Sequence, residues 1–197
     1  MTEYEQRILK QMEQSLYCPV CSLLEEEEFS MMANLQYDVT HRPELRETVT
    51  EEGGFRDYHF RQFRKIASAK TNVLVLMAMI ARYVQPGKQF VVHCRFCGHL
   101  DPYQGRLIEA ISFMLMENSF RTSYTDYRGM CKRQLESVEA GLSDEPTRGW
   151  LKEVHRDQML KEIPYVELVA TKSYYDTCGF ARGSVYRTTE KFLGRRG

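Results

Sequence analysis

The sequence predicts an all-α protein, a helical bundle built from two repeated units followed by further C-terminal helices. Three observations support this fold class. Apolar residues recur at helical spacing along most of the 197-residue chain, alternating runs typical of strands are scarce, and one Cys-containing pattern occurs twice. We expect the first repeat in residues 1–88 and the second, with the C-terminal helices, in residues 89–197. Together they would form one compact unit.

Amphipathic helices account for most of the first repeat. Residues 22–39 predict a helix whose solvent-exposed face carries the acidic run 25–28, and Pro43 predicts a short helix that Gly53-Gly54 closes. From residue 59 an apolar stripe predicts one long core helix to residue 84, which Pro86-Gly87 ends. The inward residues expected in the first of these helices are Leu23, Leu24, Met31, Leu35 and Val39.

The second repeat begins with residues 89–93, which predict a short strand or an extended segment. Residues 104–117 then form a strongly apolar helix face, and Pro146 opens a helix that contains Trp150. Two more helices are expected, at residues 165–177 and 181–193.

The repeated pattern has the residue types of a metal site. A C-x2-C motif at 18–21 precedes a Gly-led motif at 54–59, and a second C-x2-C at 94–97 precedes a Gly-led motif at 129–134. Overlaid, the two copies read C-x2-C, then G-(apolar)-C-x2-H, and three Cys with one His are typical of tetrahedral zinc. The predicted ligands are Cys18, Cys21 and His59 in the first copy and Cys94, Cys97 and Cys131 in the second.

Each copy lacks one member of the pattern. Arg56 stands where the first copy should have Cys, and Gln134 stands where the second should have His. His41 is a further ligand candidate for the first copy, and His93, His99 and Cys178 are candidates for the second. A composite site is also conceivable, in which Cys18, Cys21, Cys94 and Cys97 meet at one ion. The sequence does not decide between one shared site and two separate sites.

Structural zinc is the preferred metal, and an iron–sulfur cluster, which also uses Cys thiolates, is the alternative. A thioredoxin-type redox pair is disfavoured, because that chemistry needs the C-x2-C after a strand, and the sequence predicts no strand before Tyr17.

The first repeat resembles an uncharacterised family of bacterial proteins that is known only as a domain of unknown function. Its members carry C-P-x-C, an acidic helix rich in Leu and Glu, and G-F-C-x-x-H some 35 residues later. Residues 18–21, 23–28 and 54–59 match this layout, except that Arg56 departs from it at a ligand position. The resemblance covers roughly the first 85 residues and implies a helical, metal-stabilised module. It implies no activity.

Charge and hydropathy exclude several classes of partner. The 27 basic and 27 acidic residues cancel, which argues against nonspecific nucleic-acid binding by the whole molecule. The acidic segment 21–57 and the basic, aromatic segment 172–197 are opposed, so a local contact of the C-terminal helices with RNA or an acidic partner stays a minor alternative. The longest apolar stretch, residues 73–84, is shorter than the roughly 20 residues of a membrane span.

These patterns predict a cytoplasmic metal-binding protein, since the N-terminal residues also lack the features of a secretory signal. The expected role is a protein-interaction or accessory module, with a protein partner or a homo-oligomer. The alternative is an iron–sulfur or open-site zinc protein with a redox or enzymatic accessory role. We assign no catalytic residue and leave open whether the chain is an enzyme, preferring a non-catalytic role.

Overall fold

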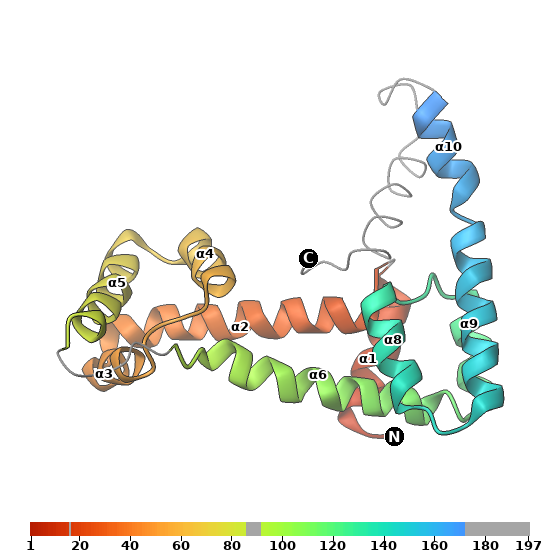
Figure 1. Cartoon of the computed structure of the whole chain (residues 1–197), viewed down its shortest axis with the longest axis horizontal. Helices are drawn as coiled ribbons and strands as arrows, with labels where there is room; N and C mark the ends of the chain where they lie inside the picture. The colour runs from red at the N-terminus through yellow and green to blue at the C-terminus, as the bar shows by residue number, and fades with distance from the viewer. Residues whose placement is uncertain (16, 86–91, 172–197) are drawn as a thin grey trace. The chain divides into compact units, whose positions relative to one another are not determined.

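The computed structural model of the chain describes residues 1–15, 17–85 and 92–171, which form ten α-helices and no strand (Figure 1). The prediction of an all-α fold is therefore confirmed. The helices are α1 (Glu3–Gln14), α2 (Pro19–His41), α3 (Pro43–Glu51), α4 (Asp57–Ile66), α5 (Ala69–Tyr83), α6 (Arg95–Met114), α7 (Asn118–Asp126), α8 (Lys132–Gly141), α9 (Glu145–Leu160) and α10 (Ile163–Thr171).

The chain folds into two compact units that do not follow the expected division at residue 88. Unit 2 is one continuous segment, Leu24–Tyr103, whereas unit 1 combines Met1–Leu23 with the described residues from Gln104 onward. Both boundaries fall inside helices, the first in α2 and the second in α6. The two compact units therefore differ in their boundaries from the two predicted sequential repeats.

Helix α2 is longer than the expected helix at 22–39, and its inward face is shifted. Pro19 occupies the first helical position, where a missing backbone N–H costs no hydrogen bond. Met32 is buried in place of Met31, which is half-buried, and Glu28 is buried at 5% exposure. We expected the whole acidic run 25–28 to face solvent, but Glu28 faces the interior.

The expected long helix from residue 59 to residue 84 is wrong, because the chain breaks it into α4 and α5. Ala67 leaves the helix with an extended backbone, and the hydroxyl of Ser68 accepts a hydrogen bond from the Thr71 amide, which caps α5. Because α5 is a separate helix, its inward face differs from the one expected for a single long helix. Val75 and Ala78 are buried, whereas Met77 is exposed. Within unit 2, α3 packs against α5.

The second half agrees with the sequence in its main helices. Helix α6 starts earlier than expected and contains Pro102, and α9 begins beside Pro146 as predicted. Val92 and His93 form no strand. Helix α10 covers the first part of the expected helix at 165–177, while the rest of that helix, the expected helix at 181–193 and residues 89–91 lie outside the described residues.

Each unit has its own apolar core. In unit 1 the side chains with at most 1% exposure include Ile8, Val20, Leu107, Ile111, Leu115, Tyr124, Met130, Val138 and Leu151. In unit 2 they include Leu24, Val39, Val49, Phe63, Val75 and Phe96. In the part of the chain that the structure describes, no helix is long and apolar enough to cross a bilayer.

Candidate metal centres

Three cysteines of unit 1 form a buried cluster. Cys18 directly precedes α2, Cys21 lies in its first turn, and Cys131 is the N-cap residue of α8. Their sulfur atoms all lie within 4.8 Å of one another. The Sγ atoms of Cys21 and Cys131 are 3.6 Å apart, although the two residues are 110 positions apart in the chain. The N-termini of two helices therefore bring distant thiols to one point.

The loop before Cys131 is held in place by one glycine and one glutamine. Gly129 has a φ of 86°, and a Cβ at this residue would lie 2.2 Å from Oε1 of Gln158. The Gln158 side-chain amide donates hydrogen bonds to the carbonyl oxygens of Tyr124 and Tyr127, at 2.9 and 2.8 Å. The Tyr127 hydroxyl in turn donates to the carbonyl of Tyr17, the residue before the C-x2-C motif. These bonds fix both sides of the cluster.

The environment favours a thiolate at Cys131. Hydrogen bonds from the thiols of Cys18 and Cys21 lower the pKa of Cys131 to about 3 despite its burial, and the backbone amides of Gln134 and Arg133 act in the same direction. Burial raises the pKa of Cys18 well above its usual range. Negative charge at this cluster is therefore concentrated on the residue at the positive end of α8.

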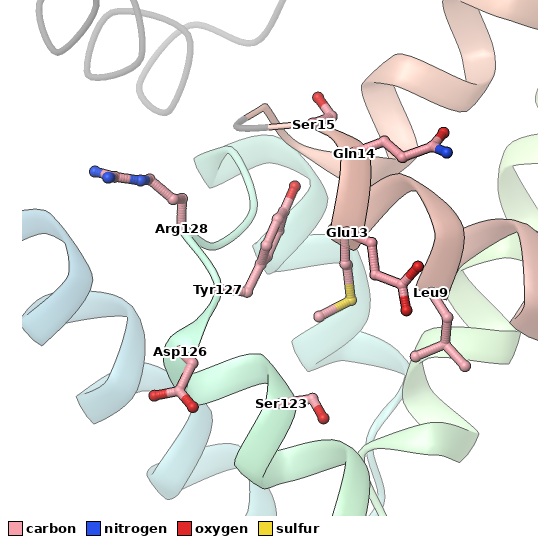
Figure 2. Close-up of a pocket in the computed structure, with 9 residues that line it drawn as sticks. Leu9, Glu13, Gln14, Ser15, Ser123, Asp126, Tyr127 and Arg128 are labelled. Atoms are coloured by element: carbon pink, nitrogen blue, oxygen red, sulfur yellow. The ribbon is translucent and has the colours of Figure 1, made fainter. Parts of the chain in front are cut away.

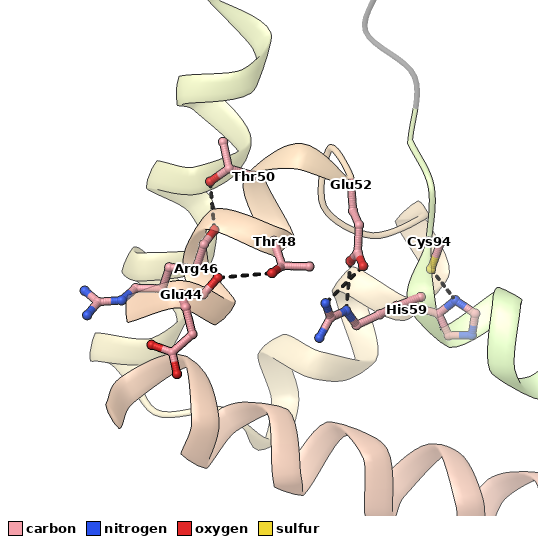
Figure 3. A network of polar contacts seen from close by, with 8 residues as sticks. Glu44, Arg46, Thr48, Thr50, Glu52, His59 and Cys94 are labelled. Atoms are coloured by element: carbon pink, nitrogen blue, oxygen red, sulfur yellow. Dashed lines mark hydrogen bonds and ion pairs between the residues drawn. The ribbon is translucent and has the colours of Figure 1, made fainter. Parts of the chain in front are cut away.

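A second cluster lies wholly within unit 2. His59, in the first turn of α4, faces Cys94 and Cys97, which flank the start of α6. The ring atom Nδ1 of His59 lies 3.3 Å from Sγ of Cys94 and 3.4 Å from Sγ of Cys97. Figure 3 shows the ring of His59 facing Cys94. His59 and Cys94 are buried, and Cys97 is half-buried.

A buried carboxylate contacts the opposite side of the His59 ring. Oε1 of Glu28 lies 3.6 Å from Nε2 of His59, and both side chains are less than 10% exposed. Phe96 packs on the ring with a centroid separation of 5.4 Å. A carboxylate on the far nitrogen of a ligating histidine fixes the tautomer and orientation of its ring. At 3.6 Å this contact is longer than a hydrogen bond, so Glu28 lies beside Nε2 of the ring while Nδ1 faces the two thiols.

The two thiols of this cluster differ in acidity. Burial raises the pKa of Cys94, but hydrogen bonds from His59 and from the backbone amides of Cys97 and Arg56 outweigh it and bring the pKa to about 7. Burial and the neighbouring charge of Cys94 raise the pKa of Cys97 to about 11, against the opposing effect of the Arg56 guanidinium. The exposed Arg56 thus places positive charge near the sulfur atoms.

Both clusters follow the same local plan. In each, a C-x2-C motif starts a long helix and faces the first turn of a short helix that follows a glycine with a φ of 86°, Gly54 or Gly129. Residue 56 is the N-cap of α4, as residue 131 is of α8. Backbone amides at the starts of α4, α6 and α8 form hydrogen bonds with sulfur atoms of the clusters, and the partial positive charge of a helix N-terminus stabilises a thiolate there.

The predicted grouping of ligands within each copy is wrong. We expected His59 to join Cys18 and Cys21, and Cys131 to join Cys94 and Cys97. The structure groups the C-x2-C of each copy with the Gly-led motif of the other, which gives the sets Cys18, Cys21, Cys131 and His59, Cys94, Cys97. The composite set of Cys18, Cys21, Cys94 and Cys97 is likewise not one of the groups that the described residues form.

None of the additional ligand candidates that the structure describes joins a cluster. Nδ1 of the exposed His41 lies 2.8 Å from the carbonyl oxygen of Tyr37, Nε2 of His99 lies 2.8 Å from a carboxylate oxygen of Glu27, and the backbone amide of His93 donates to the carbonyl of Glu52. Cys178 lies outside the described residues. Gln134, at the position expected for His, is buried, and its side-chain oxygen accepts a hydrogen bond from Gln104.

Glu28 is the main residue at these sites that the sequence interpretation missed. Its place in a run of four glutamates suggested solvent exposure. A signal was nevertheless present, because Glu28 lies four residues after Leu24 and four before Met32, both of which are buried. This spacing puts it on the inward stripe of α2.

Unit 1 also contains a pocket of about 390 Å³ at the end of α1 (Figure 2). Glu13, Ser123, Asp126, Tyr127 and Arg128 are among its lining residues. The link of Tyr127 to the C-x2-C motif makes this pocket a neighbour of the three-cysteine cluster, but its own residues do not form a recognisable catalytic arrangement. The basic, aromatic segment 172–197 lies outside the described residues.

Comparisons with known proteins leave the function to be argued from these sites. No protein-family model matches the chain, and no curated protein and no solved structure is similar to it.

Proposed function

We propose that the protein binds two structural zinc ions, one at the three cysteines of unit 1 and one at His59, Cys94 and Cys97 of unit 2. The observation that carries this proposal is the presence of two separate groups, each with three ligand atoms within 4.8 Å of one another. Each group supplies three thiol or imidazole ligands of the kind that zinc prefers, which leaves the fourth position of a tetrahedral site to water or to a residue outside the group.

The distances suit this metal. With Zn–S bonds of about 2.3 Å and Zn–N bonds of about 2.05 Å, tetrahedral geometry separates two sulfur ligands by about 3.8 Å and a sulfur from a nitrogen ligand by about 3.6 Å. The Cys21–Cys131 separation is 3.6 Å, and the two Cys–His59 separations are 3.3 and 3.4 Å. Thiol hydrogen bonds have similar lengths, so the metal content is the discriminating measurement.

The protein's own residues would prepare each site for a cation. The environment of Cys131 favours its thiolate before any ion arrives, and Glu28 lies 3.6 Å from Nε2 of His59, where a shift into hydrogen-bond distance would orient the ring with Nδ1 toward the thiols. The ion would supply bonds that join chain segments 35 and 110 residues apart, as measured by the Cys94–His59 and Cys21–Cys131 contacts. The role of the metal is thus to hold the fold together.

We propose further that this metal-stabilised helical protein acts as an interaction or accessory module in the cytoplasm. The reducing cytoplasm keeps thiols available as ligands.

Metal analysis of the purified full chain tests the proposal. Purification under anaerobic, reducing conditions, followed by elemental analysis and absorption spectroscopy, should give a colourless protein with two zinc ions per chain. Chelation should abolish helical circular dichroism. A brown protein would establish the iron–sulfur alternative, and a folded protein without bound metal that takes up none from solution would refute the proposal.

A further inference from the structure

Helix α5 of unit 2 exposes a continuous apolar stripe. Its exposed residues lie at steps of three and four, and they are Val73 (54%), Leu76 (46%), Met77 (60%), Ile80 (52%), Tyr83 (71%) and, just beyond the helix, Val84 (64%). The opposite face buries Thr71, Val75 and Ala78 in the core of unit 2. A helix that is apolar on both faces is normally covered on both.

The stripe has the residue order of a two-helix seam. With Val73 and Ile80 at heptad position a, Leu76 and Tyr83 fall at position d. β-Branched residues at a with Leu at d favour pairing of two helices. Between residues 71 and 84 the flanking e and g positions hold apolar or amide side chains, and residues 71–81 contain no charged residue, while Lys70 lies at an e position in the first turn of the helix. Self-pairing would therefore bring no like charges together along residues 71–81 of the seam.

We infer that a second copy of this chain covers the stripe, with α5 of each copy packed against α5 of the other around a two-fold axis. If the exposed parts of all six side chains were buried, about 600 Å² per copy and roughly 1,200 Å² for the pair would be covered, which is the lower end of the range of specific protein interfaces. Two-fold dimers are also the commonest homo-oligomers.

Two other occupants fit the charges less well. The segment 172–197 of the same chain has six basic and two acidic residues, so covering the stripe with it would place charged side chains against an apolar surface, whereas residues 71–81 of a second copy are uncharged. Helices that bind anionic bilayers carry Lys and Arg along their polar face. The face of α5 opposite the stripe is instead packed into unit 2.

Light scattering after size exclusion gives the oligomeric state of the full chain. The expected mass is twice the chain mass of 23.2 kDa. Ile80→Glu would place a carboxylate in the apolar seam and should raise the dimer dissociation constant about 100-fold or more. Phe29→Glu is the matched control, because Phe29 is an apolar residue of unit 2 with 61% exposure outside α5. It should leave the dimer unchanged.

Mixing charge variants shows whether the two α5 helices meet. Ile80→Glu combined with Ile80→Lys should restore a dimer if the helices are parallel, and Ile80→Glu combined with Leu76→Lys should do so if they are antiparallel, because an a position then packs against a d position of the partner. Restoration in either mixture supports the inference. Circular dichroism and metal content should match the wild type in every variant, which separates this test from the proposed metal binding.

Three results would overturn the inference. The wild type could be monomeric throughout the micromolar range, which would leave the stripe to the chain's own segment 172–197. It could be monomeric and sediment with vesicles of phosphatidylcholine and phosphatidylserine, which would make the stripe a membrane contact. It could also be a dimer that Ile80→Glu leaves as tight as the wild type, which would place the interface elsewhere.

Discussion

Double substitutions of the cysteines determine which ligands share an ion. Cys131→Ser should release the ion of unit 1 and leave that of unit 2, so that zinc falls from two ions to one per chain. Because Cys21 belongs to the same group, adding Cys21→Ser should remove no further metal. Cys97 belongs to the other group, and adding Cys97→Ser should remove the second ion.

The size of the stability change follows from the chain lengths that each site closes. Treated as cross-links, contacts between residues 110 and 35 positions apart stabilise the fold through chain entropy by about 4.8 and 3.8 kcal/mol, respectively. Cys131→Ser should therefore cost about 1 kcal/mol more than His59→Ala. For a chain of this length, loss of the larger link should lower Tm by about 10–20 °C.

Substitution with cobalt provides the assay. Cobalt(II) occupies zinc sites, and its thiolate charge-transfer absorption grows with the number of sulfur ligands. The site that survives Cys131→Ser should show the spectrum of two thiolates, and the site that survives His59→Ala should show that of three. Thermal denaturation of the same samples gives the free energies for the double-mutant cycles.

One pattern of coupling would refute the exchanged pairing. If Cys131→Ser couples with Cys97→Ser while its effect adds to that of Cys21→Ser, the ligands are grouped within each copy, as the sequence alone suggests. Cys178→Ser serves as a control for a further ligand. An effect on metal content equal to that of Cys131→Ser would show that Cys178 completes a four-cysteine site.

Four further substitutions test individual features of the sites. Glu28→Gln should weaken zinc binding in unit 2 by about 10- to 100-fold, because the His59 ring would lose the carboxylate beside Nε2. Competition with a chromophoric chelator measures this affinity. An unchanged affinity would show that Glu28 does not orient the ring. Arg56→Cys should raise zinc affinity in unit 2, since the backbone amide of residue 56 already contacts the Cys94 sulfur; no gain in the same titration would argue against the overlay of the two copies. Gly129→Ala and Gly54→Ala each force a residue with a side chain to a φ of 86°, at about 1–2 kcal/mol, and each new Cβ displaces a side chain, Gln158 at Gly129 and Met79 at Gly54. Only Gln158 loses hydrogen bonds when it moves, so urea denaturation should show a larger loss of stability for Gly129→Ala. Equal losses would contradict the role of that glutamine.

Local features of the sequence predicted the helices well where their signals were strong. Pro43 and Pro146 begin helices as expected, and the C-x2-C motifs lie at helix starts. The break at Ala67–Ser68 was missed because the apolar pattern continues across it. The hydroxyl of Ser68 caps α5, and the new helix begins with a different set of residues facing inward.

The grouping of the ligands could not be predicted from spacing. Two copies of one pattern offer the same chemistry to each other as to themselves, so nothing local distinguishes pairing within a copy from exchange between copies. The decision rests with long-range packing, such as the hydrogen bond from Tyr127 to Tyr17 that fixes the first C-x2-C near Cys131. The position of Glu28 at the site could not be predicted for the same reason, because its contact with His59 joins two different helices.

The insertion of unit 2 within unit 1 sets an order of assembly during translation. All ligands of the unit 2 cluster are present once residue 97 has been made, whereas Cys18 and Cys21 must wait for Cys131. At typical synthesis rates the intervening residues take about 2–7 s. During that interval the first two thiols are already translated while their third ligand is missing. An ion captured early by the completed unit 2 site would remove Cys94 and Cys97 as competing partners, and so would favour the correct closure of unit 1.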